Sequence, residues 1–260
     1  MLGHPRQPDP SDSMHGALLG PEYSHDEIVR YLDSIGADYE ILSDEELVDR
    51  VAQLMVDQKV IGWYRGRMEF GPRALGSRSI IADPRNPQMQ AQVNLKIKFR
   101  EGFRPFAPCV LREHVSEYFE LDADSPYMLL VADVRPEKRL PLPPEFHTLW
   151  GIDKLNVPRS VVPAITHIDF SARIQTVDRE RHGLFRQVME RFYELTGCPV
   201  ILNTSFNVRG EPIVCSPADA YRCFMYTHLD ALALGNCLLL KERQRTLAGR
   251  EEHLAQFALD

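Results

Sequence analysis

The stretch CPVILNTSFN, residues 198–207, places a short apolar run directly before a cluster of polar side chains. An apolar run of this length, followed by polar residues and by Gly210, predicts a buried strand. Proteins of the α/β class place ligands at the carboxyl ends of such strands. The pattern therefore predicts a polar cradle for a ligand, made of Asn203, Thr204, Ser205 and Asn207.

Strands and amphipathic helices alternate irregularly on both sides of this stretch. Further strands are expected within KVIGWYRG (59–66), SIIAD (79–83), APCVL (107–111), YMLLVADV (127–134), RIQTV (173–177) and DALALGNCLLLK (230–241). Helices are expected after the capping boxes SHDE (24–27) and SDEE (43–46), after Asn86-Pro87, over 182–195 and after SPAD (216–219). This irregular order predicts a single α/β domain with a mixed sheet and flanking helices.

The composition of the chain changes along its length and suggests boundaries. Residues 1–13 are rich in Pro, Asp and Ser, which predicts a disordered tail. We expect 14–58 to be a helical docking segment and 59–241 to form the main domain. Within that domain the proline-rich stretch 135–163 predicts an ordered surface excursion or a lid. The charged residues 242–260 predict a loosely held tail.

Size and composition narrow the class of protein. The chain has 260 residues and is 44% hydrophobic, as expected of a globular protein. No apolar run approaches 18 residues and the N-terminus has no hydrophobic signal core, so we expect neither a membrane span nor secretion. The five cysteines are dispersed and odd in number, which favours a reducing cytoplasm over a disulfide framework.

Positive charge is concentrated in one part of an acidic chain. The net charge is −7, yet residues 65–104 contain nine Lys or Arg against three Asp or Glu. An acidic protein with one cationic segment favours a focused anion site and argues against a surface that binds nucleic acid. Ordinary charged surface loops are the alternative explanation of this segment.

The stretch GRMEFGPRALGSRSIIADPR, residues 66–85, combines glycine with arginine. Glycines 66, 71 and 76 lie five residues apart, and glycine lets backbone N–H groups approach an anion closely. Arg73 and Arg78 add planar donors that match phosphate or carboxylate. The stretch is neither a P-loop nor a Rossmann fingerprint. A structural turn with surface arginines is the alternative.

The stretch NLKIKFREGFRPFAP, residues 94–108, carries four cations. In a strand Lys96, Lys98 and Arg100 share one face. Arg104 precedes a proline, which restricts its backbone to extended conformations. Neighbouring phenylalanines exclude water and strengthen the attraction between arginine and an anion, although plain core packing explains each ring equally well.

The stretch PAITHIDFSARIQTV, residues 163–177, brings His167, Asp169 and Arg173 close together in sequence. His167 is either a ligand-binding or a purely structural histidine. His-x-Asp lacks a convincing third ligand, so we expect no metal site in this chain. The cysteines lie in apolar surroundings and are interpreted as core residues rather than nucleophiles.

With these segments side by side, the chain resembles the C-terminal half of the NodU-type O-carbamoyltransferases. The resemblance runs from about residue 17 to 241. It is carried by GRMEFGPRALGSRSI, FREGFRPFAP, SPYM, THID and CPVILNTSFNVRGEPIV. It implies a YrdC-like twisted mixed sheet, in which KFR (98–100) and SFN (205–207) look like the KxR and SxN signatures of that fold.

The resemblance implies a carbamoyltransferase domain that uses carbamoyl phosphate and ATP, with Mg, to form carbamoyl-adenylate. A second, N-terminal type of domain would then transfer the carbamoyl group to a hydroxyl acceptor. By match of motif, Arg73 and Arg104 hold carbamoyl phosphate with Lys98 beside them. The remaining substrate- and nucleotide-binding residues are implied to be Arg78, Arg100, His167, Arg173, Asn203, Thr204, Ser205 and Asn207.

The chain departs from the family pattern in two places. The N-terminal ASKHA-type half of the family is not found in this sequence, so we expect a partner chain to carry it. Phe170 stands where the family has glycine, which either narrows the nucleotide pocket or changes a turn. Two alternatives to an active enzyme domain stay open: a folded subunit that is incomplete without its other half, and a YrdC-like module that binds RNA.

Overall fold

The computed structural model describes residues 12–257. The predicted disordered tail, 1–13, therefore lies almost entirely outside the described residues. Its last part is held in place, because the Arg181 Nε donates to the Asp12 carboxylate over 2.8 Å.

One nine-stranded sheet forms the centre of the molecule, in the order β1-β9-β8-β2-β3-β7-β4-β6-β5. The β2–β8 and β4–β6 pairs are parallel and the other pairs are antiparallel, which confirms the predicted mixed α/β sheet. The strands are β1 Glu40–Ile41, β2 Ile61–Tyr64, β3 Arg78–Ala82, β4 Ala107–Leu111, β5 Leu130–Asp133, β6 Ser171–Val177, β7 Val200–Ser205, β8 Ala231–Leu234 and β9 Cys237–Leu240.

The predicted capping boxes are all formed. Ser24, Ser43 and Ser216 each accept a hydrogen bond from the backbone N–H three residues on, and each starts a helix. The α-helices are α1 His25–Ser34, α2 Asp44–Val56, α3 Met89–Val93, α4 Val115–Tyr118, α5 Ile152–Leu155, α6 Arg179–Thr196, α7 Pro217–Tyr226 and α8 Arg250–Leu254. The short 3-10 helices are η1 His15–Ala17, η3 Arg112–His114, η4 Pro136–Lys138, η5 Pro144–His147, η6 Pro163–Ile165 and η7 Lys241–Arg243.

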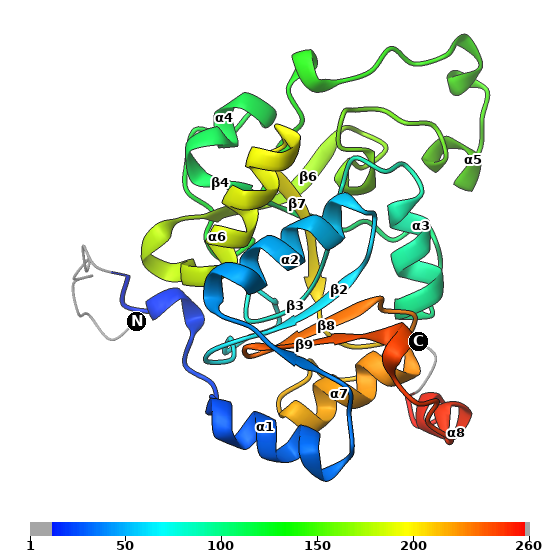
Figure 1. Ribbon diagram of the computed structural model, residues 1–260. Coiled ribbons are helices and arrows are strands. Elements are labelled where there is room, and N and C mark those ends of the chain that lie inside the picture. The colour runs from blue at the N-terminus through cyan, green and yellow to red at the C-terminus, as the bar shows by residue number, and fades with distance from the viewer. Residues whose placement is uncertain (1–11, 258–260) are drawn as a thin grey trace, which may run out of the picture.

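Helices cover both faces of the sheet. Alternate residues of β2 point to opposite faces, so Trp63 meets Phe185 of α6, whereas the Tyr64 hydroxyl donates to the Cys215 carbonyl just before α7. Figure 1 shows α2 above strands β2, β8 and β9, with α1 and α7 below them. The main core therefore has two layers of side chains, one on each face of the sheet.

The helical segment 14–58 packs into this same core. Ile28, Leu32 and Leu47 are buried within it, and β1 pairs with β9. The two predicted helices are confirmed, and the docking role of the segment stays a prediction.

The sequence prediction was wrong about the backbone around Lys98. Helix α3 begins at Met89, two residues after Pro87, and continues as the π-helix η2, Asn94–Lys98, which ends at Phe99 in the left-handed region (φ 49°). Lys96 and Lys98 consequently do not share a strand face: Lys96 is exposed and Lys98 is buried.

The stretch 127–134 also differs from the prediction of a buried strand. Strand β5 is the last of the sheet and pairs only with β6. Leu129 and Val131 are 70% and 63% exposed. The middle of the apolar run thus forms an exposed edge, whereas Met128 and Val134 near its ends are buried.

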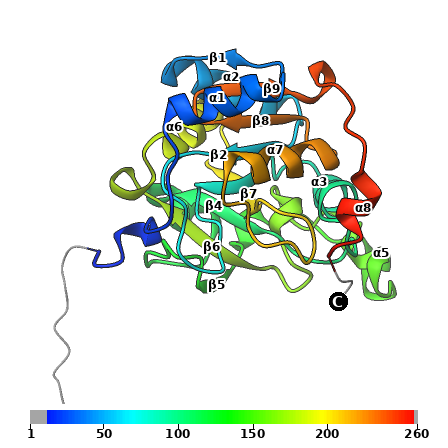
Figure 2. The same cartoon turned by 90° about the horizontal axis from the view of Figure 1, so that it is seen from below.

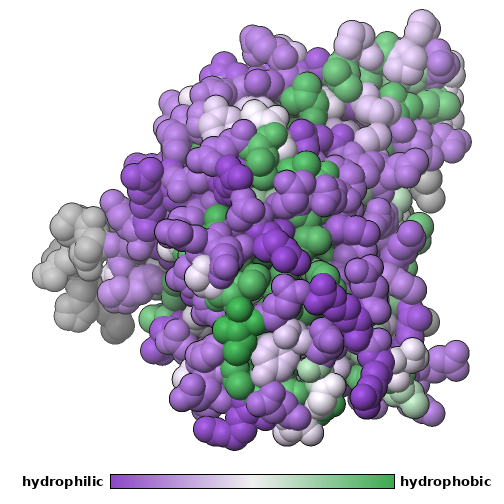
Figure 3. Space-filling model, viewed as in Figure 1, coloured by the Kyte–Doolittle hydropathy of each residue, from purple (hydrophilic) through white to green (hydrophobic). Residues whose placement is uncertain are grey.

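A buried arginine connects several parts of the excursion 135–163. The Arg159 guanidinium donates to the main-chain carbonyls of Lys154, Val157 and Thr166 at 2.8 Å each. Figure 3 shows hydrophobic side chains gathered on the surface of this part of the molecule, at the upper right. The C-terminal tail, in contrast, is not loosely held throughout, since His253 of α8 is only 7% exposed.

Candidate functional site

Several strand ends meet at one edge of the sheet and position the candidate site. The carboxyl end of β7 lies between two neighbours, because Ser205 pairs with Ser79 of β3 and Asn203 pairs with Ala107 of β4. Strand β6 runs parallel to β4 and starts at the same edge. The loops that precede β3, β4 and β6 therefore surround the polar end of β7.

A polar cavity of about 150 Å³ lies at this edge. Six of the side chains that sequence analysis singled out line it: Arg73, Arg100, Arg173, Asn203, Thr204 and Ser205. Pro72, Ala74, Pro105, Phe106, Ala107 and Met128 complete the wall. Segments more than 100 residues apart in the chain thus supply cations and amide or hydroxyl groups to one small space.

The arginines of this cavity are not neutralised. No carboxylate among residues 12–257 forms an ion pair with Arg73, Arg100 or Arg173. Burial lowers the pKa of Arg100 to about 10, with a further contribution from the positive charge of Arg104. Burial likewise lowers the pKa of Arg173, to which Arg73 adds. Burial and neighbouring positive charges thus disfavour the charged forms of these arginines. A bound anion would stabilise the charged forms, so the cavity favours an anionic ligand.

Two buried polar atoms of the cavity residues also lack partners. In the described part of the chain, Arg173 Nε and Asn203 Oδ1 are buried without a hydrogen bond. Asn203 is held in orientation, since its amide nitrogen donates to the Ala74 carbonyl and to Gln175 Oε1 at 3.1 and 3.0 Å. Buried polar groups are normally paired, so these two atoms favour a polar ligand in the cavity.

A second cavity, of about 440 Å³, adjoins the first. The two share Pro105, Phe106, Ala107 and Arg173 as walls, and the second is completed by Val131, Ile165, His167, Asp169, Ser171 and Ala172. The Asp169 carboxylate accepts from the Ser171 hydroxyl and lies 3.0 Å from His167 Nδ1. The Ser171 hydroxyl is the largest cause that lowers the pKa of Asp169, to about 2. His167 and Arg173, which sequence analysis singled out, thus both line this cavity.

Comparison with known proteins identifies the family of this arrangement. Residues 52–241 match the family described as the carbamoyltransferase C-terminus. The chain belongs to the carbamoyltransferase family. Its matches cover the C-terminal part of its relatives.

Two relatives illustrate the range of similarity. The protein sll1178 of Synechocystis sp. is 57% identical over 251 residues, which are 96% of this chain and 41% of that protein. The nodulation protein NolNO of Sinorhizobium fredii is 40% identical over 239 residues, 90% of this chain and 32% of that protein. The chain thus spans less than half the length of these curated relatives. A solved structure of full-length HypF, in its phosphate- and nucleotide-bound form, is 18% identical with a TM-score of 0.48 and covers 73% of this chain and 25% of that one.

Lys98 of the carbamoyltransferase domain lies behind the first cavity rather than in its wall. Its ammonium group donates to the Ser205 carbonyl, to the Asn207 carbonyl at 3.0 Å and to Asn207 Oδ1 at 2.7 Å. Burial lowers the pKa of Lys98 to about 7, with Arg100 as the next cause. Lys98 and Asn207 therefore hold the carboxyl end of β7, where Ser205 lies, and neither residue lines the cavity.

Arg104 and Arg78, which sequence analysis also placed in the site, lie outside both cavities. Arg104 Nε pairs with Glu101 over 3.2 Å next to the shared wall at Pro105. The Arg78 guanidinium is fully buried, stacks 3.6 Å from the centre of the Tyr64 ring and donates to the carbonyls of Arg65 and Gly66. These contacts explain the role of Arg78 in the fold, and its part in ligand binding stays a prediction.

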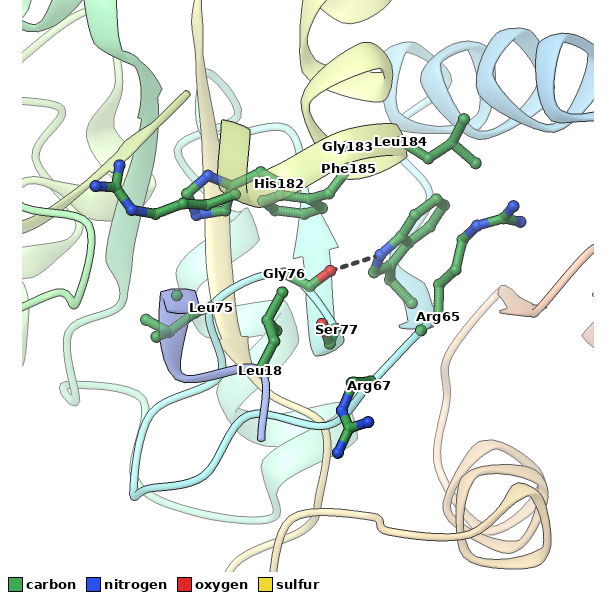
Figure 4. Close-up of a pocket in the computed structure, with 14 residues that line it drawn as sticks. Leu18, Arg65, Arg67, Leu75, Gly76, Ser77, His182, Gly183, Leu184 and Phe185 are labelled. Carbon is green, nitrogen blue, oxygen red and sulfur yellow. Dashed lines mark hydrogen bonds between the residues drawn. The ribbon is translucent and has the colours of Figure 1, made fainter. Parts of the chain in front are cut away.

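A third cavity, of about 210 Å³, lies beyond the loop that carries Arg73 and was not predicted from the sequence. Figure 4 shows Phe185 and His182 of α6 facing Gly76 across it, and the hydrogen bond from Trp63 Nε1 to the Gly76 carbonyl, 2.8 Å long. A Cβ at Gly76 would lie 2.5 Å from the Phe185 ring, so this close approach requires glycine. Two of its three arginines pair with carboxylates, Arg65 with Asp44 and Arg181 with Asp12 and Asp178, whereas Arg67 donates to the Leu19 carbonyl. This cavity therefore holds less uncompensated positive charge than the first.

Neither a group of metal ligands nor a helix able to span a membrane is found in the described part of the chain. Between residues 12 and 257, no three His, Cys, Asp or Glu side chains are grouped as metal ligands would be. None of the helices in that range is long and apolar enough to cross a membrane.

Proposed function

We propose that this domain binds carbamoyl phosphate and ATP and forms carbamoyl-adenylate, which an N-terminal type of domain or subunit uses to carbamoylate a hydroxyl acceptor. The observation that carries the proposal is the convergence of Arg73, Arg100 and Arg173, without carboxylate partners, on one small polar cavity that opens into a larger one. Membership of the carbamoyltransferase family supports the choice of the carbamoyl group.

The two cavities suit the two substrates. The smaller one, lined by arginines and by Asn203 and Ser205, matches a phosphate group, for which guanidinium groups are bidentate partners. The larger one, with apolar walls and the His167–Asp169 pair, matches a nucleoside. Arg173 lines both and would therefore contact the α-phosphate of ATP, where the substrates meet.

The chemistry requires two anions to approach each other. Hydrolysis of carbamoyl phosphate releases carbamate and phosphate. A carbamate oxygen then attacks the α-phosphorus of ATP, the bond to the β-phosphate oxygen breaks, and pyrophosphate leaves. The arginines offset the repulsion between substrates and the charge that develops at phosphorus, together with the Mg that accompanies ATP. Holding both substrates in adjoining cavities makes the step nearly unimolecular.

Pyrophosphate exchange tests the proposal. The purified chain should incorporate labelled pyrophosphate into ATP only when carbamoyl phosphate is present. Arg73→Ala should abolish this exchange, and Arg104→Ala should weaken it, because Arg104 adds positive charge at the rim. Arg112→Ala is the control, since Arg112 pairs with Asp124 on the surface.

Two negative outcomes have different meanings. If calorimetry detects binding of both substrates without exchange, the chain is a subunit that needs its N-terminal partner, and adding that region of a relative should restore exchange. If neither substrate binds, the proposal is wrong.

A further inference from the structure

The C-terminal helix α8, Arg250–Leu254, lies beyond the residues that match the family and yet contacts the site region. Figures 1 and 2 both show it beside the end of α3, from which the segment with Lys98 continues. An isolated helix of five residues is not stable in water, so its position depends on tertiary contacts. Two of its side chains make such contacts, and each contact meets a different segment of the site.

Arg250 provides the first contact. Its guanidinium lies 5.4 Å from the centre of the Phe99 ring and its Nη2 lies 3.2 Å from His228 Nε2. Phe99 is the left-handed residue between Lys98 and Arg100. The contact of Arg250 with the Phe99 ring therefore holds the backbone turn between Lys98, which is buried, and Arg100, which lines the cavity.

His253 provides the second contact. Its ring packs between Tyr226 and Phe257, with centroid distances of 4.9 and 5.1 Å. Its Nε2 lies 3.6 Å from Glu211 Oε1, and both side chains are buried. The aromatic packing holds the imidazole against the carboxylate.

Glu211 connects this contact to the site. Its Oε2 accepts from the Val208 N–H over 2.9 Å, and its carbonyl accepts from the Asn207 amide over 2.6 Å. Asn207 Oδ1 in turn accepts from Lys98 Nζ and from the Ser205 hydroxyl, at 2.7 Å each. A continuous series of contacts therefore runs from α8 to the wall of the first cavity.

The two segments that α8 contacts are also joined to each other. The Arg209 N–H donates to the Lys98 carbonyl over 3.1 Å. Displacement of either segment would therefore disturb the other.

We infer that α8 is a positioning element, whose Arg250 and His253 hold residues 98–100 and 207–211 in the geometry that the first cavity requires. Neither residue touches the cavity, so both act through Phe99 and Glu211. The catalytic consequence rests on the function proposed above, whereas the ordering of the two segments does not.

Hydrogen–deuterium exchange tests the ordering directly. In the full chain with Arg250→Ala and His253→Ala, amides in peptides covering 96–104 and 206–212 should exchange at least tenfold faster. Glu251→Ala is the matched control, because Glu251 is exposed on the same helix. His253→Gln should retain part of the protection, since its amide can donate to the Glu211 carboxylate. Unchanged protection in the double variant would overturn the inference, even if the wild-type chain proves inactive.

Kinetics provide a second readout. The double variant should raise the KM for carbamoyl phosphate about tenfold in the exchange assay, with a smaller effect on kcat, and Glu251→Ala should match the wild type. A fall in activity that merely tracks the fraction of folded protein, with KM unchanged, would contradict a positioning role. An inactive wild type would instead reject the proposed function and leave the hydrogen-exchange result to decide on α8.

Discussion

The candidate binding site lowers the folding stability of the ligand-free protein. The residues responsible are Arg73, Arg100 and Arg173. Each is partly buried. Burial lowers the pKa of Arg100 and of Arg173, and a neighbouring positive charge lowers each further, that of Arg104 beside Arg100 and that of Arg73 beside Arg173. In the ligand-free protein this cluster is unfavourable, because like charges held together repel. An anion reverses the sign of the interaction, so the same residues then stabilise the complex.

Replacing Arg173 should separate these two effects. Arg173→Gln removes the repulsion with Arg73, so the ligand-free protein should unfold at a higher temperature. Affinity for carbamoyl phosphate should fall, because a charge-assisted hydrogen bond contributes about 1.5–3 kcal/mol, or roughly 10- to 150-fold in binding. Differential scanning fluorimetry and titration calorimetry measure the two quantities. Arg112→Gln, at the surface, should change neither, and a less stable Arg173→Gln would contradict the repulsion.

Lys98 should make anion binding dependent on pH. Its pKa of about 7 means that it is mostly neutral at pH 8, and an anion beside Ser205 would raise this pKa. Binding of sulfate, whose own charge is constant here, should take up a proton at pH 8 but not at pH 6, and affinity should fall as pH rises. Calorimetry in buffers of different ionisation enthalpy counts the protons. Lys98→Met should abolish the uptake, and equal uptake in both proteins would assign it to another group.

The lowered pKa of Lys98 also makes the free energy of unfolding depend on pH. Between pH 7 and the ordinary lysine pKa of 10.5, only the unfolded chain protonates Lys98. Its contribution therefore makes the folded state more stable as pH rises through that range.

At the scale of elements, local signals predicted some structures well and others wrongly. The three capping boxes located α1, α2 and α7, because a cap and its helix are neighbours in sequence. The alternation of Lys96, Lys98 and Arg100 predicted a strand, but the structure has a π-helix there. Alternation signals a strand only when one face is buried, and here burial of Lys98 depends on Ser205 and Asn207, which are distant in sequence.

The turn before β6 contains Phe170, whose backbone conformation favours glycine. Phe170 adopts φ 67°, a left-handed conformation that disfavours side chains, so a glycine would fit this turn without strain. Its ring does not line the nucleotide-sized cavity and instead lies 4.6 Å below the Arg139 guanidinium, which belongs to the excursion. Phe170 therefore shapes the turn and does not line that cavity.

Two substitutions at this position should differ in stability. Phe170→Ala loses the stack with Arg139 and keeps the strained backbone, whereas Phe170→Gly loses the stack but relieves the strain. We therefore expect Phe170→Gly to be more stable than Phe170→Ala by about 1 kcal/mol in urea denaturation. Equal stability of the two variants would show that the turn is not strained.

At the scale of the whole molecule, the nine strands join all parts of the chain into one core. The segment 14–58 contributes buried side chains and β1 to the same sheet. We expect a single cooperative unfolding transition, with coincident curves from far-UV circular dichroism and from the fluorescence of the buried Trp63. Two separated transitions would instead identify 14–58 as an independent unit.

The sequence predicted which residue types gather at the candidate site. It did not predict which of these residues line the cavity and which are buried behind it. Sequence analysis named the six polar residues of the first cavity, because glycine, arginine and strand-end signals mark anion sites locally. It did not distinguish the arginines that line the cavity from Arg78, whose partners are carbonyls from separate loops. The contacts of α8 were also missed, since His253 and Glu211 are separated by some 40 residues and no local pattern joins them.

Strand β5 ends the sheet with an apolar edge that no other strand of the described chain covers. Unpaired edges of this kind recruit further strands from other molecules. In concentrated preparations, the domain should self-associate along this side, and a lysine in place of the exposed Leu129 should keep it monodisperse in light scattering. The edge strand β5 therefore influences how this protein behaves in concentrated solution, while its Val131 also lines the second cavity.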